Sequence, residues 1–346
     1  MDGQEVIEGL GMRAAALERW LKAHVPGFAG LRGVEKFATG QSNPTWRLRA
    51  ESGDYVLRAK PPGRLLKSAH LVEREFRVMA ALAGSAVPVP RMLALAEDAD
   101  SPIGRAFFVM EHVPGRIFWD PALPELPRVR RAAIYDAMNA TLAALHSVDV
   151  QAVGLGDFGR PGNYFARQVK LWSRQYLAAA RTPREDLLAV MRWLEANIPE
   201  DDGRCALVHG DFRLDNMIFH PEHPRVVALL DWELSTIGHP LADLAYQCAQ
   251  WRMSHDGPLR GLGGLDRAAL GLPSEEEYVA AWCARHGLGE IPCWSFYLAF
   301  SLFRFAAILE GVVRRAEEGN ASNPETGRRY GAAIPELAGL AARLVL

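Results

Sequence analysis

The most constraining feature of this chain is a cluster of polar residues set between short apolar segments, from Leu207 to Asp231. The apolar segments are typical of short strands or buried loop edges, and lie at Ala206–Val208, Met217–Phe219 and Val226–Leu230. Polar groups between such segments are held rigidly beside a core, as a functional site requires. The members of the cluster, all within 25 residues, are His209, Asp211, Asp215, Asn216 and Asp231.

The order of these residues matches the needs of phosphoryl transfer. Asp211 lies five residues before Asn216, and Asp231 follows a strand-like segment. Phosphoryl transfer uses one carboxylate to accept or orient the proton of the attacking hydroxyl, and an amide and a second carboxylate to hold magnesium. We therefore predict Asp211 as the catalytic residue and Asn216 and Asp231 as metal ligands. The alternative, that these are ordinary turn residues, stays open for Asp215.

These motifs resemble a known family. The segment His209–Asn216, with Asp231-Trp232-Glu233 after the next strand, is similar to the aminoglycoside phosphotransferase-like kinases, which use His-Gly-Asp where protein kinases use His-Arg-Asp. Gly238–Ala245 resembles the same family, and the resemblance spans most of the chain. A closer similarity, to the kinase-like domain fused to acyl-CoA dehydrogenases in animals and to its free-standing bacterial relatives, is carried by Gly40–Asn43, Arg58–Gly63 and Phe303-Arg304.

The resemblance implies a two-lobed, protein-kinase-like α+β fold that uses ATP and Mg²⁺. Residues 1–110 would form the nucleotide-binding lobe, with an antiparallel sheet and one helix. Residues 111–346 would form a larger, mainly helical catalytic and substrate lobe. In the family the backbone between the lobes binds the adenine edge, which here falls on Glu111 and Val113.

The residue pattern of the first lobe agrees with this expectation. The periodicity predicts a helix over 12–25, strands between Val34 and Lys60, and a helix over 69–82. The turn Gly40, Gln41, Ser42 and Asn43 is expected over the phosphates, although a plain hairpin loop is the alternative that its residues alone favour.

Two cations of the first lobe are candidates for the phosphates. Arg58 is favoured over Lys60, because Pro61-Pro62 puts Lys60 at the frayed end of the strand. In the kinase pattern a helix carboxylate sets this cation, and the register of the family assigns that role to Glu75. Glu73 is interpreted as solvated helix charge.

The second lobe is predicted to be mainly helical, with core helices around 134–146, 187–198 and 295–315. His146 is interpreted as a structural histidine, and the resemblance implies that Asp243 braces the catalytic loop. Arg304 lies within an apolar helix and is expected to pair with an internal carboxylate rather than with a substrate anion. The segment 251–274 lacks periodicity and is a candidate substrate cover.

Composition excludes several classes of protein. The formal charge of −2 gives no reason to expect binding to nucleic acid or to a membrane. Four cysteines without Cys-x-x-Cys spacing indicate reduced thiols, and neither a signal peptide nor a membrane span is recognisable. We therefore expect a cytoplasmic protein, of unknown oligomeric state, that acts on a small molecule.

The sequence indicates the type of reaction more clearly than the molecule that accepts the phosphoryl group. We expect transfer of the γ-phosphoryl group of ATP to a hydroxyl of a small molecule, and the closer resemblance implies a hydroxyacyl compound or its coenzyme A thioester. The alternatives are an aminoglycoside kinase and a catalytically silent nucleotide-binding module. A hydrolase that uses His209 and Asp211 lacks a nucleophile motif such as Gly-x-Ser-x-Gly.

Overall fold

The computed structural model describes residues 6–37, 43–63, 71–318 and 324–346. The chain forms two compact units, which are described separately. The first unit is Met1–Gly115 with Val227–Leu234, and the second is Arg116–Val226 with Ser235–Leu346. The segment Val227–Leu234 therefore belongs with the first unit, although it lies far along the sequence.

The first unit is built on an antiparallel sheet of order β3-β4-β5-β7-β6. A two-stranded β1-β2 hairpin precedes it. The pairing confirms the predicted hairpins, with Thr45 opposite Arg58 and Arg58 opposite Phe108. The strands are β1 (Val6–Ile7), β2 (Met12–Arg13), β3 (Leu31–Lys36), β4 (Thr45–Ala50), β5 (Gly53–Ala59), β6 (Met92–Ala96) and β7 (Phe107–Glu111).

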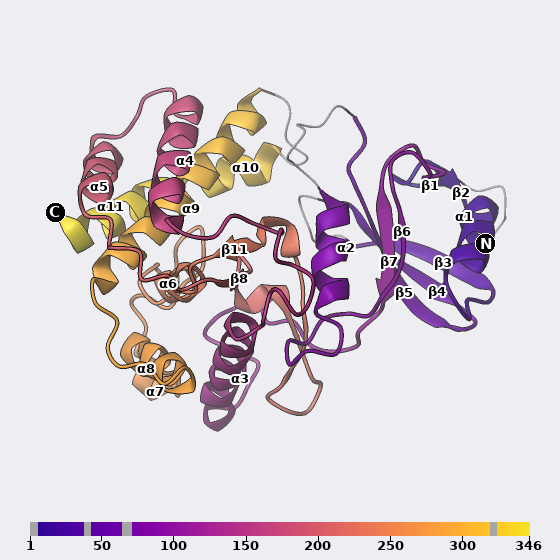
Figure 1. Cartoon of the computed structure of the whole chain (residues 1–346), viewed down its shortest axis with the longest axis horizontal. Helices are drawn as coiled ribbons and strands as arrows, with labels where there is room; N and C mark the ends of the chain where they lie inside the picture. Colours follow the sequence, from indigo (N-terminus) through magenta and orange to yellow (C-terminus); the bar gives the residue numbers. More distant parts are fainter. Residues whose placement is uncertain (1–5, 38–42, 64–70, 319–323) are drawn as a thin grey trace. The chain divides into compact units, whose positions relative to one another are not determined.

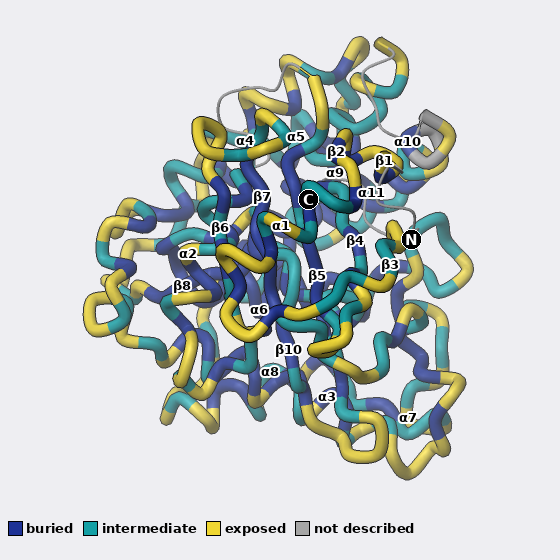
Figure 2. The backbone as a smooth tube through the Cα atoms, turned by 90° about the vertical axis from the view of Figure 1, so that its right-hand side faces the viewer, coloured by how far each residue is buried: buried dark blue, intermediate teal, exposed yellow. Residues whose placement is uncertain are grey.

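Two helices, α1 (Ala14–His24) and α2 (Val72–Ala81), cover the two faces of this sheet (Figure 1). Successive strand residues point to opposite faces. Leu57 and Phe107 accordingly join the core that includes Leu17 and Leu21 of α1, whereas Phe108 contacts Phe76 of α2. Strand alternation thus places Arg58, like Phe108, on the α2 face. The tubes of β5 and β7 are largely dark blue in Figure 2, as expected for the centre of a covered sheet.

The second unit is mainly helical, as predicted. Several of its helices pack against α9, among them α4, α6 and α11. Its helices are α3 (Arg128–His146), α4 (Tyr164–Ala179), α5 (Glu185–Ala196), α6 (Leu241–Ala249), α7 (Arg267–Leu270), α8 (Glu275–Arg285), α9 (Trp294–Glu317), α10 (Pro324–Gly331) and α11 (Ile334–Val345).

Helix α9 is the one described helix that is long and apolar enough to cross a membrane. Of its apolar window, 67% is buried inside the structure, which is what the core helix of a folded domain shows. Arg304 lies in the middle of this helix, and its side chain is buried with the rest.

Short strands carry the polar cluster of the sequence. β8 (Ala206–Val208) pairs antiparallel with β11 (Thr236–Gly238), and the loop of residues 209–216 leaves the end of β8. The loop closes with the 3-10 turn η1 (Leu214–Asn216), which leads into β9 (Met217–Phe219). β10 (Val226–Leu229) precedes Asp231, and η2 (Trp232–Leu234) follows it.

Candidate active site

Within the first unit, a chain of polar side chains joins strand β5 to helix α2 and to Asp231. The guanidinium of Arg58 lies 2.9 Å from the Glu75 carboxylate through Nε and 2.6 Å from the Asp231 carboxylate through Nη2. Asn43 donates to the other oxygen of Glu75 at 2.7 Å. The geometry places Arg58 with Glu75, the carboxylate that the resemblance assigns to it, and also with Asp231, a contact that the sequence analysis did not predict.

The charged groups of this cluster shift one another's pKa values. Burial raises the pKa of Glu75, and Asp231 adds to the rise, against the opposing effect of Arg58 and the hydrogen bond from Asn43. Burial alone would lower the pKa of Arg58, but Glu75, Asp231 and Glu233 outweigh it and raise that pKa. Arg58 is therefore a permanent cation here.

Asp231 has a left-handed backbone, with φ of 64°. Among residues with a side chain, Asp and Asn adopt this conformation most readily, because their short polar groups bond locally. Trp232 is fully buried directly after it and donates from its indole to the carbonyl of Leu229 at 2.9 Å. The bend at Asp231 thus presents the carboxylate while the next side chain anchors in the core.

Lys60 takes a different set of partners from Arg58. Its ammonium pairs with Glu73 of α2 and lies 2.9 Å from Asp98. The interpretation of Glu73 as solvated helix charge is therefore wrong, because the carboxylate neutralises a buried lysine. With two carboxylates beside it, Lys60 supports the edge of the sheet, which is consistent with the preference for Arg58 as the phosphate cation.

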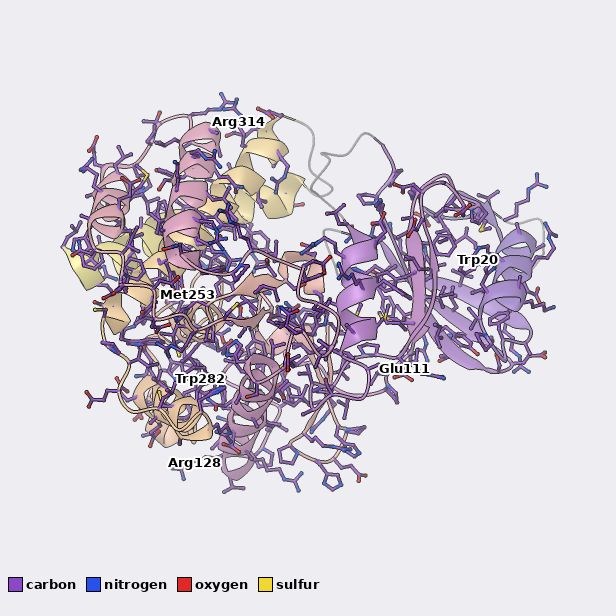
Figure 3. The ribbon with its side chains drawn as sticks, in the orientation of Figure 1. Trp20, Glu111, Arg128, Met253, Trp282 and Arg314 are labelled. Atoms are coloured by element: carbon purple, nitrogen blue, oxygen red, sulfur yellow. The ribbon has the colours of Figure 1, made fainter. Side chains whose placement is uncertain are left out.

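The structure describes only some of the other residues that are predicted to bind the nucleotide. Gly40, Gln41 and Ser42 lie outside the described residues. Glu111, labelled in Figure 3, ends β7, and its carboxylate accepts from the backbone N–H of Arg91 at 3.0 Å. Val113 follows in a segment without regular secondary structure. The adenine contact expected at Glu111 and Val113 stays a prediction.

Within the second unit, the Asp211 carboxylate is held at both oxygens. The side-chain amide of Asn216 donates to Oδ2 at 2.9 Å and to the Asp211 carbonyl at the same distance. The hydroxyl of Tyr246, on α6, donates to Oδ1 at 2.7 Å. Burial alone would raise the pKa of Asp211, but the guanidinium of Arg213 and the Tyr246 hydroxyl outweigh it and lower the pKa. Asp211 is thus a fixed anion.

The backbone before Asp211 is braced by Asp243, as the resemblance implied. The two carboxylate oxygens of Asp243 accept from the N–H groups of His209 and Gly210, at 2.7 and 2.8 Å. His146 lies 3.4 Å from the same carboxylate and accepts from the indole of Trp282 at 3.2 Å, which confirms a structural role for that histidine. Trp282 lies on α8 and is labelled in Figure 3.

His209 shapes the loop as well. Its ring is fully buried, and Nδ1 accepts from the backbone N–H of Asp211 at 3.2 Å. Gly210 has φ of 85°, a conformation that favours glycine. The His-Gly-Asp motif therefore serves two purposes: the histidine and glycine fix the backbone, and the aspartate presents its carboxylate.

Arg304 does not make the internal carboxylate pair expected from the sequence. Its Nη2 donates to the carbonyl of Gly210 at 2.8 Å, and its guanidinium lies 5.4 Å from the ring centres of both Trp172 and Tyr246. The partner is a backbone carbonyl, which a side-chain pattern does not reveal.

Tyr246, which binds the Asp211 carboxylate, was not predicted from the sequence either, although its spacing of three from Asp243 puts both residues on one face of α6.

The donor set fits a magnesium ion that arrives with a nucleotide. No group of three His, Cys, Asp or Glu side chains that could hold a metal lies among the described residues. Magnesium commonly keeps several waters and takes only one or two protein carboxylates besides phosphate oxygens. In the second unit the nitrogen of the Asn216 amide is bound to Asp211, which leaves its oxygen for such a role. In the first unit Asp231 separately offers a carboxylate.

Comparison with known proteins identifies the family. The model of the phosphotransferase enzyme family matches residues 33–278. The chain belongs to this family. It is 48% identical over 328 residues to acyl-CoA dehydrogenase family member 10 of Mus musculus, covering 94% of the chain and 30% of that protein. The chain thus spans less than half the length of this relative.

Solved structures share the fold of this phosphotransferase. A protein of Ralstonia eutropha JMP134, provisionally named an aminoglycoside phosphotransferase, is 46% identical, with a TM-score of 0.85 over 96% of this chain and 97% of that one. The aminoglycoside phosphotransferase APH(4)-Ia, in a complex with ADP and hygromycin B, is 16% identical, with a TM-score of 0.62 over 95% and 98% of the two chains. At that identity the second likeness concerns the fold alone, and it confirms the expected kinase-like architecture.

Proposed function

We propose that this phosphotransferase moves the γ-phosphoryl group of ATP to a hydroxyl of a small molecule, with Asp211 as the catalytic residue. The observation that carries the proposal is the fixed, ionised Asp211 carboxylate beside the Asn216 amide. A carboxylate held in this way orients an attacking hydroxyl and accepts its proton as the bond to phosphorus forms.

We propose that residues of the first unit, together with Asn216, bind the phosphates of the nucleotide and its magnesium ion. Arg58, set by Glu75, would neutralise the α- and β-phosphates, and Asn43 would hold the turn before β4 to Glu75. Asn216 and Asp231 would hold magnesium, which supplies charge stabilisation on the transferred group when it is bound. The complex of APH(4)-Ia with ADP supports an adenine nucleotide.

For the acceptor we propose a hydroxyacyl compound or its coenzyme A thioester. The 48% identity to a protein named as an acyl-CoA dehydrogenase family member supports this choice. A polycationic aminoglycoside needs free carboxylates, and around the segment 251–274 the carboxylates of Asp120 and Asp266 are engaged, whereas Asp256 is exposed. Asp120 pairs with His255 and Arg260 at 3.1 and 2.9 Å, and Asp266 caps α7.

Those ion pairs bear on the proposed substrate cover as well. Besides His255 and Arg260, the N–H of Ser254 donates to Glu336 at 2.6 Å, and Arg252 pairs with Glu275 at 2.9 Å. The segment is therefore fastened at several points, and we propose it as a fixed wall of the acceptor site rather than a moving lid.

An ATP-consumption assay with a panel of acceptors tests the proposal. The panel should contain 2-, 3- and 4-hydroxybutyryl-CoA, the free hydroxy acids, and aminoglycosides such as hygromycin B. We expect turnover with at least one hydroxyacyl compound, and phosphorus NMR of the product should show a phosphate monoester. Turnover of aminoglycosides alone would overturn the acceptor class, and nucleotide binding without turnover of any acceptor would indicate a silent module.

A further inference from the structure

The Asp211 carboxylate is supported by residues outside the His-Gly-Asp tripeptide. Tyr246 and Asn216 each donate to one oxygen of Asp211, at 2.7 and 2.9 Å. With one donor at each oxygen, rotation of the carboxylate is blocked on both sides. The Tyr246 side chain is buried, and this burial, with the neighbouring charge of Asp211, raises its pKa, so its hydroxyl remains a donor.

Arg304 supports the same carboxylate from the backbone side. The peptide group that joins Gly210 to Asp211 has its carbonyl bound by Arg304 at 2.8 Å, and the N–H of Gly210 is bound by Asp243 at 2.8 Å. Gly210 is thus held at both its N–H and its carbonyl. Since this residue precedes Asp211, the direction in which Asp211 projects is set as well.

The burial of Arg304 calls for a reason. Arg304 is only 6% exposed, and among the described residues its guanidinium forms no ion pair with a carboxylate and donates to the carbonyl of Gly210. A buried charge without a counter-ion costs several kcal/mol of solvation, and well-packed apolar residues often replace buried ions without loss of stability. The ring faces of Trp172 and Tyr246 compensate part of this cost. A purely structural position between two aromatic rings would be filled more cheaply by Met or Leu.

We propose that Arg304 and Tyr246 act as a pair of positioning residues for Asp211. Arg304 fixes the backbone at Gly210 and the face of the Tyr246 ring, and Tyr246 fixes the Oδ1 atom of Asp211. The pair leaves the remaining lone pairs of the carboxylate in one direction, toward the acceptor hydroxyl. The inference rests on the proposed function for its catalytic meaning, whereas the positioning itself is a property of the folded chain.

Hydrogen exchange measured by mass spectrometry tests the positioning without any acceptor. In Arg304→Met, the backbone amides in the peptide 207–219 should exchange at least about tenfold faster than in the wild type, because the loop loses its carbonyl anchor. Peptides from α3 should keep their exchange rates. Arg285 is a partly buried arginine that pairs with Asp136 and donates to Asn139 at 2.9 Å. Arg285→Met is the matched control and should leave the peptide 207–219 unchanged.

Kinetics with the best acceptor of the panel tests the catalytic meaning. We expect Arg304→Met to lower kcat by about 100-fold and Tyr246→Phe by about tenfold, with the KM for MgATP within about twofold of the wild type. Guanidinium chloride at millimolar concentration should restore part of kcat to Arg304→Ala. Tyr176→Phe, which removes another buried hydroxyl bonded to the N–H of Arg184, should keep full activity.

The outcomes separate the two proposals. Unchanged exchange in Arg304→Met together with unchanged kcat in Tyr246→Phe would overturn the positioning pair. If the wild type phosphorylates none of the acceptors, the proposed function fails, and the exchange experiment still decides the positioning. If Arg304→Met also speeds the hydrogen exchange of the α3 peptides, Arg304→Lys and Tyr246→Phe are measured in its place, since both keep the volume of the core. Slower turnover in these variants with unchanged exchange in α3 would support the pair.

Discussion

The Arg58 guanidinium joins Asp231 and Glu75 through two different nitrogen atoms, at 2.6 and 2.9 Å. The planar fork of an arginine makes both contacts at once, whereas a lysine carries a single point charge. The residue that links the sheet to helix α2 therefore also sets the carboxylate expected to meet magnesium.

Arg58→Lys should weaken nucleotide binding although it keeps the charge. We expect the dissociation constant for MgATP to rise about tenfold, because one ammonium cannot reach both carboxylates and the phosphates. Isothermal titration calorimetry measures this constant directly. An unchanged constant would show that the fork geometry of Arg58 plays no part in binding. Arg49→Lys, at an exposed side chain of β4 that pairs with Glu35, is the control.

Asp231→Asn separates the charge of this residue from its backbone conformation. Asn tolerates the φ of 64° as well as Asp does, so the thermal stability of the variant should stay close to that of the wild type. Without the carboxylate, the magnesium dependence of ATP binding should be lost. Titrations of ATP with and without Mg²⁺ measure this dependence. If magnesium still tightens ATP binding in the variant, Asp231 is not a magnesium ligand.

The raised pKa of Glu75 predicts a pH-dependent stability. The pKa in the folded state lies above the ordinary value of 4.5, so the folded state binds the proton more tightly than the unfolded state. The resulting stabilisation is fully present below about pH 4.5 and is lost as the pH rises through the raised pKa. Urea denaturation of the wild type and Glu75→Gln between pH 4.5 and 8 should show a fall in unfolding free energy that the variant lacks. Identical slopes in the two proteins would contradict the shift.

Asp243 is expected to contribute more to stability than to chemistry. Its side chain is fully buried and accepts from two backbone N–H groups. Asp243→Asn should lower the free energy of unfolding by about 2–4 kcal/mol, because at least one buried donor loses its partner. Asp136→Asn, whose side chain is 65% exposed, should cost less than about 0.5 kcal/mol. Equal urea midpoints for the two variants would refute the bracing role.

Much of this arrangement could be predicted from the sequence, because local patterns carry it. The alternation of β5 puts Arg58 on the α2 face, and the resemblance to the family selects Glu75 over Glu73. The three short strands β8, β9 and β10 were expected within one residue of their observed bounds, since apolar runs interrupted by Gly and Asp leave little freedom.

What the sequence did not reveal depends on contacts between distant segments. The partner of Arg304 is a backbone carbonyl 94 residues away, and every residue carries such a group, so no pattern marks this one. The charged residue in an apolar helix therefore suggested a carboxylate that is not there. The ion pair of Glu73 with Lys60 was missed for a similar reason, because Asp98 joins the lysine from outside the helix and the strand.

The most direct test of the account compares Asp211→Ala with the wild type in ATP turnover and in ATP binding. We predict a loss of at least about 1,000-fold in turnover with the best acceptor, with the dissociation constant for MgATP within about threefold of the wild type. Asp186→Ala, which removes an ion-paired carboxylate elsewhere in the second unit, should keep its turnover. Retained activity in Asp211→Ala would contradict the central claim that this carboxylate orients the acceptor hydroxyl.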